Sequence, residues 1–231
     1  MTPENEFDRN PALTANYERA PRLFIPAYDA SHAMAAVLLK DHVCDGGHIM
    51  VVGAGGGVEL SVFARECAGW KFTAIDPSHE MLKLARMKAE STGALARVSW
   101  VQGTVDDAPR ERHDAATAFL SLSFIPDDGH RLQTLREIHS RLKPGAYFLM
   151  ITHCTDKNAP RYEDDLRVYA AFARRSGATE EMIEAALRMQ RETLHPVSRE
   201  REEEMLADAG FYDIEIFYAG LMVCGWIARA S

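Results

Sequence analysis

The fold is decided by residues 48–67, whose sequence is HIMVVGAGGGVELSVFAREC. The mostly apolar run at 48–52 predicts a buried strand, and helical spacing of apolar residues begins at Val58. Between them lies a glycine-rich loop at 53–57. Glycines let a backbone turn sharply and bring its N–H groups against a ligand at the start of a helix. The stretch therefore predicts a strand, a ligand-binding loop and a helix, in that order.

Strands and helices continue to alternate over the next hundred residues. Such alternation implies right-handed crossovers and a mostly parallel sheet with helices on both faces. Two closing strands are expected to form a hairpin around Gly220. The predicted strands are 48–52, 71–75, 97–101, 115–120, 146–151, 212–218 and 222–228, and the predicted helices of the alternating part are 31–43, 58–67, 78–91 and 130–142.

Helical sequence outside this alternation is expected to cover the ligand loop. Residues 1–43, interrupted by four prolines before residue 30, form a predicted N-terminal lid. Residues 155–210 are charge-dense and helical, and they are predicted to form a cap inserted after the fifth strand. We expect a single domain over 1–231 in which lid and cap keep water from a site at the carboxyl edge of the sheet.

Composition limits the classes of partner. The chain has 231 residues, with 34 acidic residues against 26 Lys and Arg, for a net charge of -8. Such a surface repels phosphate backbones, so nucleic-acid binding is disfavoured. No stretch approaches the roughly 20 apolar residues of a membrane span, and the four cysteines have no paired spacing. We therefore expect a cytoplasmic protein that binds no membrane, with a homodimer allowed.

The spacing of the glycines excludes two common nucleotide sites. The dinucleotide fingerprint needs glycine at its sixth position, where this chain has Val58 or, in a frame shifted by two, Leu60. A phosphate-binding NTPase loop needs Lys after its last glycine, and Gly57 is followed by Val58. Asp76 ends the second predicted strand, where a carboxylate can accept ribose hydroxyls or cap the next helix. Because Ser78 can fill the cap, the ribose role is favoured.

Five segments, in order, resemble the motifs of class I S-adenosylmethionine-dependent methyltransferases. They are GAGGG (53–57), AIDPSHEMLKLAR (74–86), VQGTVDDAP (101–109), SLSFIPDD (121–128) and LREIHSRLKPGAYFLMITH (135–153). The flanks resemble a bacterial small-molecule group that is distantly like carboxy-S-adenosylmethionine synthase. The resemblance implies an α/β fold with a doubly wound, mostly parallel sheet of seven strands (Rossmann-like), and S-adenosylmethionine as the cofactor.

The resemblance also implies roles for single residues. The glycine loop would line the methionine part of the cofactor, Asp76 would hold the ribose, and residues after the fourth strand would line the methyl end. The N-terminal segment would fold over the cofactor. The implied cofactor-binding residues are Tyr17, Arg22, Tyr28, Gly53, Ala54, Gly55, Asp76, Pro77, Met81, Thr104, Val105, Phe119, Leu120 and Ser123.

Two positions depart from the pattern of the family. Thr104 stands where the family usually has an acidic residue against the adenine amino group. Val51 stands where an acidic residue is common two positions before the first glycine, so the methionine ammonium must find other acceptors.

Methyl transfer from a sulfonium is an in-line displacement, which requires alignment and exclusion of water and for which a general base is optional. The candidate catalytic residues are His153 just past the fifth strand, Tyr28 in the lid and Tyr162 at the start of the cap. Each also has a structural interpretation, as a buried histidine or a packed aromatic ring. The nine histidines form no HxxxH or HExxH pattern, so no metal is expected.

The resulting prediction is an enzyme that methylates a small-molecule acceptor. Two alternatives stay open. The first keeps the cofactor but changes the chemistry, either to an internal reaction that releases methylthioadenosine or to carboxymethyl-type chemistry. The second is a noncatalytic cofactor-binding module or a tRNA-modification enzyme.

Overall fold

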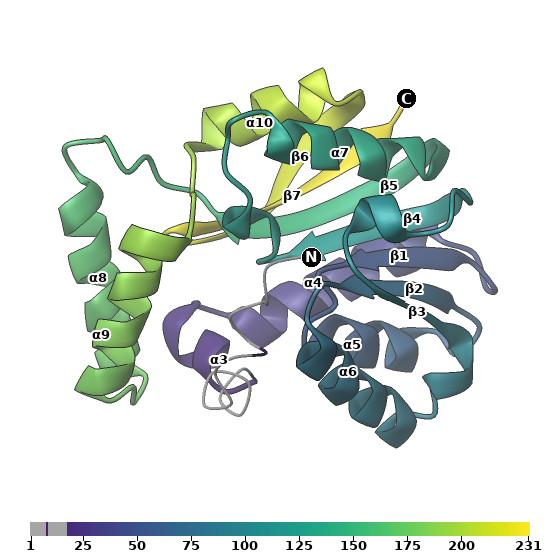
Figure 1. Ribbon diagram of the computed structural model, residues 1–231, viewed down its shortest axis with the longest axis horizontal. Coiled ribbons are helices and arrows are strands. Elements are labelled where there is room, and N and C mark those ends of the chain that lie inside the picture. Colours follow the sequence, from purple (N-terminus) through teal and green to yellow (C-terminus); the bar gives the residue numbers. More distant parts are fainter. Residues whose placement is uncertain (1–7, 9–17) are drawn as a thin grey trace.

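A seven-stranded sheet forms the centre of the protein in a computed structural model that describes Asp8 and residues 18–231 (Figure 1). The strands are β1 (His48–Val52), β2 (Lys71–Asp76), β3 (Val98–Gln102), β4 (His113–Phe119), β5 (Leu142–His153), β6 (Phe211–Gly220) and β7 (Val223–Ala230). Their order is β3-β2-β1-β4-β5-β7-β6, and only β7 runs antiparallel to its neighbours. This is the predicted doubly wound arrangement.

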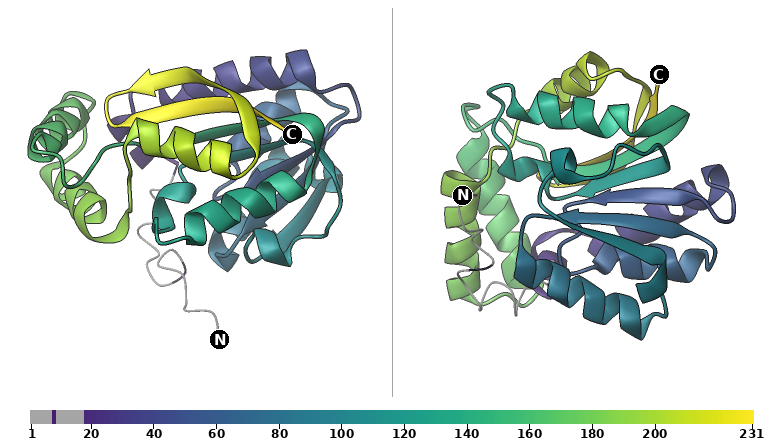
Figure 2. Two further views of the ribbon diagram at one scale, coloured as in Figure 1. Left: turned by 90° about the horizontal axis from the view of Figure 1, so that it is seen from above. Right: turned by 45° about the vertical axis from the view of Figure 1, so that its right-hand side comes forward.

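Helices cover both faces of the sheet (Figures 1 and 2). One face carries α4 (Tyr28–His42), α5 (Val58–Glu66) and α6 (His79–Ser91), and the other carries α7 (His130–Ser140) and α10 (Arg199–Asp208). Side chains of β1 alternate between two apolar cores: Ile49 and Val51 pack with α4 and α5, whereas Met50 and Val52 pack with α7. None of the helices in the described part of the chain is both long and apolar enough to span a membrane.

Helix starts follow local capping chemistry where a hydroxyl is available. Ser78, Thr179 and Ser198 each accept a hydrogen bond from the backbone N–H three residues later, at 3.2 Å. The first predicted helix instead begins three residues early, at Tyr28, after Ala27 in a left-handed conformation (φ 54°). Ser31 therefore lies inside α4 and donates to the Tyr28 carbonyl.

The fifth strand is longer than the sequence predicted. Helix α7 ends at Ser140, and β5 starts at Leu142 and runs through Pro144 and Gly145. The register with β4 shifts between His113 and Ala115, an irregularity that accommodates a proline where a ladder hydrogen bond is missing.

The predicted cap range, 155–210, divides into two parts. Helices α8 (Tyr162–Arg175) and α9 (Glu180–Arg188) lie beyond the edge of the sheet, beside α3 (Ala20–Phe24). Helix α10 instead lies against β6 and α7, where Met205 and Leu206 are buried. Like α8 and α9, it consists of charge-dense helical sequence, so sequence did not separate it from them.

The N-terminal helices contact the outlying ones. The rings of Phe24 in α3 and Tyr169 in α8 are 5.3 Å apart. The Tyr218 hydroxyl in β6 donates to the carbonyl of Pro26. Of the predicted lid, 1–43, only Asp8 and residues 18–43 belong to the described part, and Tyr17 lies outside it.

Candidate active site

The glycine loop needs glycine for two separate close approaches. Gly53 (φ 69°) passes the segment after β4, where a Cβ would come within 2.2 Å of the Ser121 Cβ. Gly57 (φ 79°) lies against α6, where a Cβ would come within 2.8 Å of the Ala85 Cα. Both glycines are also in the left-handed region that disfavours other residues. The loop therefore brings its N–H groups and the start of α5 to the carboxyl edge of the sheet.

Asp76 holds the loop against the next helix. Its Oδ2 accepts from the Gly55 N–H at 2.8 Å, and its Oδ1 accepts from the Ser78 N–H at 2.9 Å. Ser78 itself caps α6 by accepting from the Met81 N–H. Burial raises the pKa of Asp76 to about 6, although the two N–H donors oppose the shift. The side chain is thus a fixed, buried carboxylate beside the loop and is not the N-cap of α6.

The residues predicted to meet the adenine follow the ends of β2 and β3. Met81 and Val105 are buried, whereas Pro77 and Thr104 are exposed. Both the N–H and the hydroxyl of Thr104 donate to Asp107 Oδ2, at 2.8 and 3.2 Å. A carboxylate therefore lies beside the position where the family pattern places one, although it comes from three residues further along the chain.

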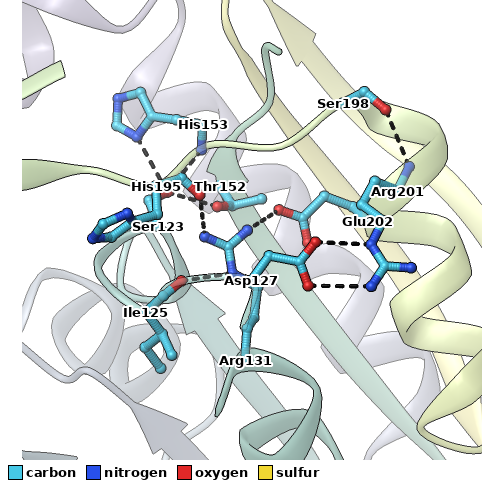
Figure 3. A network of polar contacts seen from close by, with 10 residues as sticks. All are labelled: Ser123, Ile125, Asp127, Arg131, Thr152, His153, His195, Ser198, Arg201 and Glu202. Atoms are coloured by element: carbon cyan, nitrogen blue, oxygen red, sulfur yellow. Dashed lines mark hydrogen bonds and ion pairs between the residues drawn. The ribbon is translucent and has the colours of Figure 1, made fainter. Parts of the chain in front are cut away.

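Hydrogen bonds to β5 hold the segment after β4. Phe119 is buried, and Leu120 adopts a left-handed conformation (φ 59°) while its N–H donates to the Ile151 carbonyl. Ser123 is fully buried, with its hydroxyl 2.7 Å from the Thr152 hydroxyl and accepting from the His153 N–H at 3.1 Å (Figure 3). Ser123 thus holds the segment in place through its side chain.

His153 lies at the end of β5, directly beside Ser123. Its Nδ1 is 3.4 Å from the Ser123 hydroxyl. Burial lowers the pKa of His153 to about 4, so the imidazole is neutral at pH 7 and is a weaker base than an exposed histidine.

The lid contributes a buried aromatic pair. The rings of Tyr28 and His32 are 4.4 Å apart, and His32 in turn packs edge-on against Phe119 at 5.1 Å. Burial raises the pKa of Tyr28. Arg22 donates to both oxygens of Asp29, at 2.9 and 3.0 Å, and its guanidinium lies 5.6 Å from the Tyr28 ring. The structure therefore joins Tyr28 to the end of β4 through His32.

Tyr162 bonds within the outlying helical part of the chain. The hydroxyl donates to the Gln190 carbonyl at 3.2 Å, and the ring packs in the core with Tyr169. Both contacts lie within the outlying helices, which matches the packing interpretation.

Sequence reasoning missed Glu59, which lies in the first turn of α5. It is 5% exposed and accepts from the Thr117 hydroxyl at 2.8 Å. Thr117 is the register partner of Val51, so the carboxylate lies next to the strand position where the family pattern has an acid. Burial raises the pKa of Glu59 to about 8. An acid between Val58 and Leu60, in a helix turn that faces the core, was the available signal.

Asp8 was also missed. Its Oδ1 accepts from the Ser78 hydroxyl at 2.6 Å and from the Glu80 N–H at 3.1 Å. Asp8 therefore lies at the start of α6, and its charge helps to raise the pKa of Asp76.

Residues 49–145, which contain the glycine loop and Asp76, match the family model described as "Methyltransferase domain". The chain contains a class I S-adenosylmethionine-dependent methyltransferase domain. Carboxy-S-adenosyl-L-methionine synthase of Desulfotalea psychrophila is 22% identical to this methyltransferase, over 94% of the chain and 89% of that protein. Ubiquinone biosynthesis O-methyltransferase of Vibrio cholerae is 30% identical, but over only 50% of the chain and 46% of that protein.

The fold is also shared with solved structures. A putative O-methyltransferase from Nostoc punctiforme superposes with a TM-score of 0.70 at 14% identity, covering 99% of the chain and 63% of that structure. The residues present fit two parts of an S-adenosyl cofactor: the buried Asp76 is an acceptor for hydroxyls, and the buried Met81 and Val105 offer apolar surface for a base.

Proposed function

We propose that this enzyme transfers the methyl group of S-adenosylmethionine to a small-molecule acceptor. The observation that carries the proposal is the bond between the Gly55 N–H and Asp76, which fixes a buried carboxylate directly beside the glycine loop. A carboxylate held there can accept two hydroxyls without moving, which is what a ribose requires. The Vibrio cholerae relative is named for O-methylation in ubiquinone biosynthesis, which supports a small-molecule acceptor.

The proposed cofactor contacts follow the elements of the site. Gly53, Ala54 and Gly55 hold the methionine part, and Asp76 holds the ribose. Apolar and polar residues on the far side of Asp76 receive the adenine, and those after β4 line the methyl end. The full proposed set is Arg22, Tyr28, Gly53, Ala54, Gly55, Asp76, Pro77, Met81, Thr104, Val105, Phe119, Leu120 and Ser123, with Tyr17 outside the described residues.

Glu59 is the residue we add to this set. The methionine part carries an ammonium, and a family acid at the Val51 position is missing. Glu59 places a carboxylate next to that position from the neighbouring helix, held by Thr117. We propose that a cationic ligand ionises Glu59, because an opposite charge stabilises a buried carboxylate.

Catalysis then depends on alignment and on exclusion of water. When bound, S-adenosylmethionine supplies an electrophilic methyl group on a positively charged sulfur. The end of β4 positions that side of the site, and the Tyr28–His32 pair closes it from the lid. His153, neutral at pH 7, is the candidate for taking a proton from the acceptor. Tyr28 is the second candidate, and Tyr162 is assigned to packing.

A reducing compartment is the proposed location. All four cysteines are free, and Cys67, Cys154 and Cys224 are buried. The net charge of -8 supports a small-molecule acceptor over a nucleic acid.

A second candidate function rests on the breadth of one match. The Desulfotalea psychrophila relative, named as a carboxy-S-adenosyl-L-methionine synthase, is similar over 94% of the chain, whereas the named O-methyltransferase is similar over 50%. The enzyme could therefore modify the cofactor itself. Mass spectrometry of the cofactor after incubation with and without a metabolite extract separates the two: methyl transfer needs an acceptor and leaves S-adenosylhomocysteine.

Calorimetry with S-adenosylmethionine and Asp76→Ala tests the cofactor site. Loss of a carboxylate that accepts two hydroxyls is expected to weaken binding by about 2–4 kcal/mol, roughly 30-fold to 1,000-fold. Asp208→Ala, at the exposed end of α10, is the matched control and is expected to change affinity far less. Unchanged affinity in folded Asp76→Ala would show that the carboxylate only ties the loop to α6.

A further inference from the structure

Three metal-ligating side chains meet at the edge of the sheet opposite the glycine loop. His48 is the first residue of β1 and His113 the first residue of β4, while Glu111 precedes β4. One ligand atom from each lies within 4.8 Å of the others. The glycine loop follows the carboxyl end of β1, so this cluster at the amino end is separate from the site already described.

The hydrogen bonds of His113 leave its unprotonated nitrogen, Nε2, on the side of the cluster. Its Nδ1 is 3.1 Å from the Arg141 carbonyl, which can only accept, so Nδ1 carries the proton. Its Nε2 therefore has a lone pair, 3.1 Å from the Thr73 hydroxyl and 3.9 Å from Glu111 Oε1. A backbone carbonyl that fixes the tautomer in this way is the usual arrangement behind a metal-bound imidazole.

His48 approaches the same point from the neighbouring strand. Its Nε2 is 2.9 Å from the Thr73 hydroxyl, and the two imidazole rings are 4.5 Å apart. Thr73 has one hydroxyl proton and cannot donate to both nitrogens. In the His48 tautomer that carries its proton on Nδ1, two imidazole lone pairs and one carboxylate oxygen lie within 4.8 Å of one another.

The spacing of these groups suits a small ion. Tetrahedral zinc takes histidine nitrogens at about 2.0–2.1 Å and carboxylate oxygens at about 2.0–2.2 Å, which places ligand atoms about 3.4 Å apart. His113 is buried and fixed, whereas the Glu111 side chain is 48% exposed and free to rotate inward. Burial also lowers the pKa of His113, which keeps the ring neutral as a ligand must be.

We propose that His48, His113 and Glu111 bind a zinc ion, with water in the fourth position. The Thr73 hydroxyl then hydrogen-bonds that water. Because the three ligands come from β1, β4 and the segment before β4, a bound ion ties that segment to the sheet.

Zinc alone, titrated into the chelator-treated full chain, tests the proposal. Calorimetry is expected to show one site per chain, and thermal unfolding is expected to shift upward with zinc. Glu111→Gln removes an exposed ligand and is expected to lower zinc affinity about tenfold or more, and His48→Gln about 100-fold or more, by loss of an inner ligand. His130→Gln is the matched control, because His130 is exposed and bonded to Asp128.

Two results would overturn the site: absence of stoichiometric zinc binding by the wild-type chain, or equal affinity in wild type and Glu111→Gln. If His48→Gln does not fold, Glu111→Lys decides the matter, since a cation at this exposed position must abolish binding at the proposed site. Binding retained in Glu111→Lys would place the ion elsewhere, for example on the exposed Cys44.

Discussion

Two buried glutamates on opposite faces of the sheet have different partners. Glu202 in α10 is fully buried and accepts from Arg131 Nη1 at 2.7 Å (Figure 3). Glu59 in α5 is almost as buried, and the partner shown for it is the Thr117 hydroxyl. Burial raises the pKa of both, to about 7 for Glu202 and about 8 for Glu59. The fold thus supplies a cation for one acid, and we infer that the cofactor supplies it for the other.

On the Glu202 face of the sheet, Arg131 connects several segments of the chain. Arg131 is fully buried and also donates to the carbonyls of Ile125 and His195. Four parts of the chain therefore meet at one guanidinium: α7, the segment after β4, the segment returning from α9, and α10. Asp127 and Arg201 add a second, partly exposed pair beside it, at 2.9 Å.

The largest expected effect comes from breaking the paired side. Arg131→Met leaves the Glu202 carboxylate buried without its cation, and we expect a loss of about 3–5 kcal/mol in the free energy of unfolding. Denaturant unfolding measures this loss. The double variant Arg131→Met, Glu202→Leu is the control and should recover much of it, since an apolar pair needs no charge compensation. A double variant as unstable as the single one would contradict the pairing interpretation.

Substitution of Glu59 is expected to have a smaller effect, on cofactor affinity. Its effect on the free energy of unfolding is expected to be of opposite sign to that of Arg131→Met. Glu59→Gln removes the charge while keeping the size and the bond to Thr117. We expect S-adenosylmethionine affinity to fall by about 1.5–3 kcal/mol, the range for a hydrogen bond to a charged group, as measured by calorimetry. Thr117→Val, which removes only the hydroxyl, should cost less affinity.

The same variant has a defined pH dependence. The pKa of Glu59 is raised from 4.5 to about 8 in the folded chain, so between these values the folded state holds a proton that the unfolded state has lost. Stability from this group therefore falls as pH rises through that window. Glu59→Gln should be more stable than wild type at pH 8, on the order of 4 kcal/mol, and within about 1 kcal/mol of it at pH 5. Equal stability at both pH values would show that Glu59 is already ionised and paired.

The smallest effect is expected in the outlying helices. Tyr162→Phe removes one hydrogen bond to the Gln190 carbonyl and should cost about 0.5–1.5 kcal/mol of stability, with little change in turnover. Initial rates with saturating cofactor measure the turnover. A drop in turnover of a hundredfold with unchanged stability would move Tyr162 from packing to catalysis, and Tyr28→Phe provides the comparison from the lid.

The features that sequence predicted are those encoded within a few neighbouring residues. Local composition and spacing are enough to recognise the run at 48–52, the glycine loop, Asp76 and the Ser78 cap. The structure has the predicted doubly wound, mostly parallel sheet as well, because alternating strands and helices leave few topologies.

What sequence did not predict depends on residues far apart in the chain. Glu59 accepts a hydrogen bond from Thr117, which comes 58 residues later in the chain. Arg131 donates to Glu202, which comes 71 residues later. His48 and His113 meet only because β1 and β4 are neighbours. Helix α10 was grouped with the cap because its sequence is as charge-dense as that of α8 and α9, which does not show what its few apolar residues cover.

The order of the last two strands has a consequence for biosynthesis. Strand β6 is made before β7, yet β7 lies between β5 and β6, so β6 joins the sheet only after residue 223 and beyond have been synthesised. The Tyr218 hydroxyl that holds Pro26 arrives with β6. A nascent chain thus contains a complete glycine loop long before this bond to the segment between α3 and α4 can form. A chain that stopped before β7 would keep the loop but would lack the neighbouring strand that places Tyr218 in the sheet.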